Sequence, residues 1–136
     1  MKLKHDYFFD ELWILTKDGI PIIEITELEH TKQLILGGFY SALQSFCRTM
    51  SGEEIKSILM GDIKFICKSI FQGEIILTIK CTKKIKEKTI NKFLNVIGGI
   101  FENLYELNDI LEWQGDAHFF STFRDALSNY LQLSNL

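Results

Sequence analysis

The stretch ELWILTKDGIPIIEI, Glu11 to Ile25, decides how this chain begins to fold. Its first part, Glu11–Thr16, is rich in aromatic and branched apolar side chains, which predicts a β-strand. Asp18-Gly19 favours a two-residue hairpin turn, after which Ile20–Ile25 returns as a second strand. Pro21 has no backbone N–H to give to a neighbour, so we expect the second strand at an edge of its sheet.

A helix is predicted next, from Lys32 to about Met50, with Thr31 as its N-cap. Two adjacent glycines interrupt it, and each costs roughly 1 kcal/mol relative to alanine. A helical projection gives one broad apolar arc, which includes Ala42. The opposite side carries small residues: Gly37, Ser41 and Ser45, flanked by Gly38.

Three strands follow as a meander, at Glu54–Met60, Ile63–Ile70 and Glu74–Thr82. Gly61-Asp62 predicts a tight turn between the first two, and Phe71–Gly73 predicts the next turn. Counting outward from the second turn pairs Cys67 with Leu77. Apolar residues occur on both faces of the last strand, so we expect the sheet to be covered at least in part on both sides.

Two helices are predicted to end the fold. The first runs from about Lys84 to Leu107, and the second follows Gly115 with Asp116 as a possible cap. The paired glycines Gly98-Gly99, in the helix from about Lys84 to Leu107, are most simply explained by close packing of these two helices. The basic run KKIKEKTINK, Lys83 to Lys92, is interpreted as a solvated first turn, with an anionic-lipid contact as the alternative.

The composition is that of an ordinary globular protein. A chain of 136 residues with 46% hydrophobic and 24% charged residues fits one domain, residues 1–136. The net charge of −3 gives no support to nucleic-acid binding. No signal peptide opens the chain and no apolar run reaches the roughly 20 residues of a membrane span, so we expect a cytoplasmic protein, at most peripheral to a membrane. The three cysteines are predicted to be free thiols: Cys47, Cys67 and Cys81.

The sequence contains no recognisable catalytic or metal-binding motif. The three histidines, His5, His30 and His118, have no partner at metal-ligand spacing. No nucleophile motif occurs, and the Gly37-Gly38 pair lies inside a helix rather than in a phosphate-binding loop. We therefore expect no catalytic residue, no metal and no cofactor, and only a cleft with converging polar groups would revive an enzymatic interpretation.

The order of elements, β-β-α-β-β-β-α-α, resembles the longin superfamily, which includes the roadblock family. Three stretches carry the resemblance: DELWILTKDGIPIIEI, GGFYSALQSFCRTMSGEEIKSILMGDIKF and DILEWQGDAHFFSTF. It implies an α+β fold with a five-stranded antiparallel sheet of order 2-1-5-4-3. One helix would lie on one face, and the two C-terminal helices on the other. The superfamily has no shared catalytic residues.

The resemblance also implies a function. A stand-alone longin-like domain would be a non-catalytic protein-interaction module that dimerises and serves a small GTPase or a membrane-trafficking complex as platform or regulator. An unpaired edge strand is a template for another chain, so we expect a homo- or heterodimer interface on the first helix and third strand: Gly37, Gly38, Ser41, Ser45, Glu54, Lys56, Ile58 and Met60.

Two alternatives stay open at this point. One of the paired glycines, Gly37 or Gly38, would instead let the helix lie close to its own sheet. The second alternative is that the protein is a small-molecule sensor of the profilin-like or PAS-like kind, which holds a ligand between helix and sheet. An unfilled apolar cavity there would favour the sensor, whereas a filled core beside an exposed edge strand would favour the interaction module.

Overall fold

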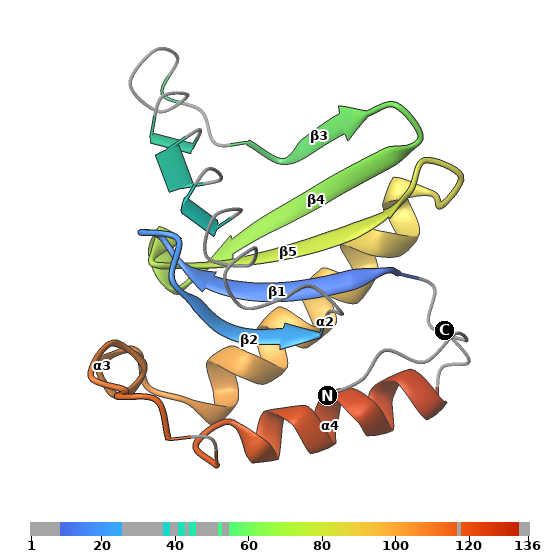
Figure 1. Cartoon of the computed structure of the whole chain (residues 1–136). Coiled ribbons are helices and arrows are strands. Elements are labelled where there is room, and N and C mark those ends of the chain that lie inside the picture. The colour runs from blue at the N-terminus through green and yellow to red at the C-terminus, as the bar shows by residue number, and fades with distance from the viewer. Residues whose placement is uncertain are drawn as a thin grey trace.

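The computed structural model describes residues 9–25, 37–38, 41–42, 44–45, 52, 55–116 and 118–133. Five strands form one antiparallel sheet in the order β2-β1-β5-β4-β3 (Figure 1). Their bounds are β1 Glu11–Thr16, β2 Pro21–Ile25, β3 Ser57–Met60, β4 Ile63–Ile70 and β5 Ile75–Thr82. The predicted sheet order is confirmed, with β2 and β3 at its two edges.

The turns show how local sequence sets the register. Met60 pairs with Ile63, so Gly61-Asp62 is the predicted two-residue turn. The β1–β2 turn is longer than predicted, because the Thr16 N–H donates to the Ile20 carbonyl at 2.9 Å and leaves three residues between them. Gly19 ends that loop with a φ of +88°, a left-handed conformation that glycine adopts at low cost.

The β4–β5 turn differs from the prediction. Ile70 pairs with Ile75, so the turn contains four residues rather than three, and Cys67 lies opposite Thr78 instead of Leu77. Two of the turn residues, Phe71 and Gln72, have positive φ angles of 51° and 56° although neither is glycine. Sequence spacing alone did not reveal this left-handed pair, because Phe and Gln are unusual in that conformation.

The main core lies between one face of the sheet and the helices α2, Glu87–Leu104, and α4, Ser121–Leu133. Figure 1 shows α2 crossing behind the strands, with α4 beside it. Alternation along the strands directs one set of side chains to this face, and the fully buried members of the core include Leu12, Ile14, Ile23, Ile75, Leu77, Ile79, Phe93, Ile97, Phe101, Phe123 and Leu127.

Both C-terminal helices differ from their predicted bounds. α2 begins at Glu87 and ends at Leu104, and a short helix α3, Leu107–Leu111, follows it. The corner before α4 is held by Asp116, which accepts hydrogen bonds from the indole N–H of Trp113 and the backbone N–H of His118, both at 3.0 Å. α4 therefore begins at Ser121, later than the predicted cap at Asp116 implied.

Gly98 has a different role from the predicted one. A Cβ built on Gly98 would lie 3.3 Å from Ile70 and 3.9 Å from Leu77, so this position brings α2 close to the sheet rather than to α4. A Cβ on Gly99 would meet nothing within 4 Å. One glycine of the pair therefore has a packing reason, and the structure gives none for the other.

The first helix is described at residues 37, 38, 41, 42, 44 and 45, all of which are helical. Its predicted ends, Lys32 and Met50, and its predicted cap, Thr31, lie outside the described residues. Gly37 packs within reach of Leu15, whose side chain belongs to the face of the sheet opposite α2. Helices thus lie on both faces of the sheet, as the resemblance to the longin superfamily implies.

Candidate protein-interaction surface

One of the two edges of the sheet is strand β3, which pairs only with β4 in the described part of the chain. It is shorter than the predicted strand and begins at Ser57, although the Cys67 N–H still donates to the Lys56 carbonyl at 2.9 Å. Glu54, the first residue of the predicted strand, lies outside the described residues. With four residues, β3 is therefore a short edge strand that pairs with the eight-residue strand β4.

The register shows which backbone groups of β3 face outward. Bonded and non-bonded pairs alternate along an antiparallel ladder. Because Lys56 lies opposite Cys67 and bonds to it, the pairs of Ile58 and Met60 also exchange bonds with β4. Ser57 and Leu59 fall between them, so their N–H and C=O groups point to the open edge. A second strand placed there would find two donors and two acceptors.

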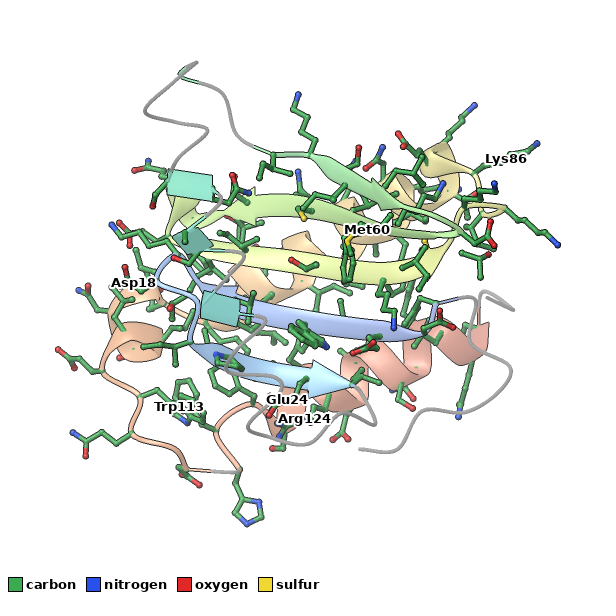
Figure 2. The ribbon with its side chains drawn as sticks, turned by 45° about the horizontal axis from the view of Figure 1, so that its top comes forward. Asp18, Glu24, Met60, Lys86, Trp113 and Arg124 are labelled. Atoms are coloured by element: carbon green, nitrogen blue, oxygen red, sulfur yellow. The ribbon has the colours of Figure 1, made fainter. Side chains whose placement is uncertain are left out.

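Exposed apolar side chains cluster at the β3–β4 hairpin. Leu59 is 66% exposed, Met60 60% and Ile63 37%. Ile58 is partly buried against Trp13 and its neighbours on the face of the first helix. Figure 2 labels Met60 on this edge side of the sheet. Large apolar groups left in water beside unpaired backbone are typical of a surface that another chain covers.

Gly37 and Ser41 lie against the chain's own β1–β2 turn. A Cβ on Gly37 would come closer than 3.0 Å to the Gly19 carbonyl oxygen, a separation that real Cβ atoms essentially never show. The Ser41 hydroxyl donates to the Lys17 carbonyl at 2.6 Å. Figure 2 shows Asp18 of this turn next to the helical segments. Gly37 therefore follows the alternative in which a glycine lets the helix approach its own sheet.

The exposed side of the first helix is rotated from the predicted one. Gly38 is exposed and a Cβ there would meet nothing within 4 Å. Ala42, predicted on the apolar arc, is exposed as well, and so is Ser45. Among the described positions of this helix, the small residues that face outward are Gly38, Ala42 and Ser45.

Gln44 links the helix to the edge strand, a role that the sequence prediction missed. It is 3% exposed, and its amide oxygen accepts from the Ile55 N–H at 2.9 Å while its amide nitrogen donates to the Ile55 carbonyl at 3.2 Å. This two-point bond satisfies the backbone just before β3 and holds the strand beside the helix. The only signal in the sequence is that Gln44 places an amide well inside an apolar helical pattern, whereas the other glutamine of that pattern, Gln33, stands at its start.

The sheet face under the first helix is partly polar. Glu11, 7% exposed, forms an ion pair with Lys80 at 3.0 Å, directly opposite it on β5. Thr78 contacts the Cys67 sulfur at 3.8 Å. The indole N–H of Trp13 is buried and has no hydrogen-bond partner among the described residues. Such a donor loses its hydration without compensation, which costs about 1–3 kcal/mol.

The described titratable groups with shifted pKa values lie outside the edge strand β3 and the first helix. Burial raises the pKa of the Cys81 thiol, and the nearby Lys64 ammonium only partly opposes this. Burial also raises the pKa of Tyr105, whose hydroxyl oxygen accepts from the Phe123 N–H at 3.2 Å. Cys67 and Cys81 are free thiols, as predicted, whereas Cys47 lies outside the described residues.

Two features of other protein classes are absent from the described residues. They contain no group of three or more His, Cys, Asp or Glu side chains that could hold a metal ion. None of the helices in this part of the chain combines the length and apolar character needed to cross a bilayer.

Comparison with known proteins identifies the fold. The structure is similar to the Roadblock/LC7 domain from Streptomyces avermitilis, with a TM-score of 0.61 and 10% identity over 72% of this chain and 86% of that one. It is also similar to Myxococcus xanthus MglB, with a TM-score of 0.53 and 12% identity over 72% of this chain and 87% of that chain. No family model and no curated protein sequence matches the chain. At these identities the likeness is one of fold.

Proposed function

Because this chain has the roadblock/longin-like fold, we propose that it is a non-catalytic interaction module that dimerises and regulates, or serves as a platform for, a small GTPase or a membrane-trafficking-type complex. The observation that carries the proposal is the edge strand β3, where the backbone groups of Ser57 and Leu59 point away from β4 beside exposed apolar side chains. The free thiols fit a reducing compartment, so we place the protein in the cytoplasm.

The interface would join the edge strand to the exposed side of the first helix. Gln44 fixes the two elements to each other, and the outward small residue Gly38 lets a partner backbone come close. Of the residues first predicted for this interface, Gly38, Ser45, Lys56, Ile58 and Met60 stay in the proposal. Gly37 and Ser41 support it indirectly by docking the helix on its hairpin.

A pair of proline variants tests the edge. Ser57→Pro removes an N–H that points outward, so the β3–β4 ladder is kept while pairing with a second chain is blocked. Ile58→Pro is the matched control, because it removes an N–H that bonds to β4 and should destabilise the fold. Size-exclusion chromatography with light scattering should give the mass of two chains for the wild type and of one folded chain for Ser57→Pro.

The outcomes separate a homodimer from a heterodimer. A wild type that is monomeric at micromolar concentration would exclude self-pairing. The partner would then be sought by capture from native lysate to which a GTP analogue or GDP has been added. The wild type and Ser57→Pro would serve as baits side by side. If both proteins capture the same partners equally, the edge is not an interface.

The orphan indole of Trp13 supports a second candidate function, the small-molecule sensor. A ligand between the first helix and the sheet would supply the acceptor that the described residues do not give this buried N–H. Native mass spectrometry of the purified protein tests this by showing added mass above the polypeptide. Trp113→Phe leaves Trp13 as the single tryptophan, so extraction of a bound ligand should then change the indole fluorescence. Unchanged mass and fluorescence would exclude a retained ligand.

A further inference from the structure

An uncovered strip of the sheet forms a groove between β3 and α2. Its volume is about 650 Å³, and a smaller hollow of about 170 Å³ shares Ser57 and Glu87 with it and continues along β3. The floor is β4, at Ile66 and Lys68. The walls are Ile55 and Ser57 on one side and Asn91 and Asn95 of α2 on the other. The groove lies on the face of the sheet and adjoins the proposed dimer edge, with which it shares Lys56 and Ser57.

The described residues that line this groove carry a net positive charge, opposite in sign to that of the whole protein. Four lysines line the two connected hollows, at positions 56, 64, 68 and 83, and Glu87 is the only acidic residue among the described residues that line them. Lys83 pairs with Asp62 at 3.2 Å, and the Lys64 ammonium donates to the Ile85 carbonyl. The chain as a whole carries −3. A local excess of positive charge on an acidic protein favours an anionic occupant.

Asn91 and Asn95 add a second kind of recognition. They lie one helical turn apart on the same side of α2, both exposed and both lining the groove. A carboxamide offers a donor and an acceptor together, which matches the alternating C=O and N–H groups of an extended peptide. The continuation of the groove ends beside the exposed side chain of Leu59, which offers an apolar contact.

We propose that the groove between β3 and α2 binds an extended acidic segment of a partner protein. Lys56 and Lys68 neutralise its carboxylates, Asn91 and Asn95 bond to its backbone, and Leu59 contacts an apolar residue at one end. A single-stranded nucleic acid fits less well, because no aromatic side chain occurs among the described lining residues and base stacking would have no platform.

The test uses the full chain and a displayed library of random peptides. Selection on the wild-type protein should enrich sequences rich in Asp and Glu. A fluorescein-labelled copy of an enriched peptide then gives the affinity by anisotropy. Binding should weaken as salt rises, and the side-chain NH₂ signals of Asn91 and Asn95 should shift in NMR spectra on titration.

Two variants with equal change in charge provide the decisive comparison. Asn91→Asp with Asn95→Asp adds two negative charges inside the groove, and Lys92→Glu makes the same change of net charge on a neighbouring exposed position that does not line it. At separations of several ångströms the groove variant should bind the peptide roughly ten-fold more weakly or worse, and Lys92→Glu should stay within about two-fold of the wild type.

Three results would overturn the proposal. The selection enriches no acidic sequence, or the two variants bind an enriched peptide equally well, or a single-stranded oligonucleotide of similar length binds more tightly than the peptides. Peptide binding that persists when the wild type is diluted until light scattering gives the mass of one chain would show that the groove works without the dimer, so the two proposals can fail separately.

Discussion

The contact between Gly37 and Gly19 gives a sharp stability prediction. A methyl group at residue 37 would meet the Gly19 carbonyl closer than 3.0 Å, and backbone atoms cannot move aside as a flexible side chain does. At Gly38 the same methyl group meets nothing within 4 Å. Both positions are helical, so Gly→Ala brings each variant the same gain of about 1 kcal/mol in helix propensity.

The difference between Gly37→Ala and Gly38→Ala therefore isolates the clash. Overpacking of this kind costs typically 1–3 kcal/mol. We expect Gly38→Ala to be more stable than the wild type by up to about 1 kcal/mol, and Gly37→Ala to be less stable than Gly38→Ala by about 1–3 kcal/mol. Urea unfolding followed by circular dichroism measures both free energies of unfolding. Equal stability of the two variants would refute the close helix–hairpin contact.

Further predictions concern single side chains. Ser41→Ala should lower the free energy of unfolding by about 1 kcal/mol, because it removes the 2.6 Å bond to the Lys17 carbonyl; no loss in urea unfolding would argue against that bond. Gln72→Gly should raise it by about 0.5–1 kcal/mol, since a φ of 56° suits glycine, and a decrease would contradict the strain assigned to the β4–β5 turn. The raised pKa of Cys81 favours the neutral thiol in the folded state, so its contribution is fully present below the unfolded pKa of about 8.5 and is lost as pH rises from there towards the folded pKa. Cys81→Ala should flatten that alkaline decline in a series of unfolding curves, and an unchanged slope would assign the decline to other groups.

The strands themselves, though not their order in the sheet, followed from local sequence. Alternating and β-branched runs set the bounds of β1 and β4, and Gly61-Asp62 set the turn between β3 and β4. Pro21 correctly placed β2 at an edge, because a proline nitrogen cannot donate within a sheet. These features depend on residues close together in the chain, and the resemblance in element order then supplied the arrangement of the five strands.

The tertiary structure decided which side of the first helix faces outward. A helical projection ranks positions by their apolar character, so it placed Gly37 and Ser41 on the outer side and Ala42 on the inner. The actual orientation is set by contacts with residues distant in sequence: Gly19 against Gly37, Lys17 against Ser41, and Ile55 against Gln44. A backbone carbonyl that approaches a glycine, or an amide that satisfies a strand end, leaves no hydrophobic signal in the sequence. The groove between β3 and α2 is likewise a tertiary product, because its lysines and asparagines come from elements whose proximity only the packed sheet and helix create.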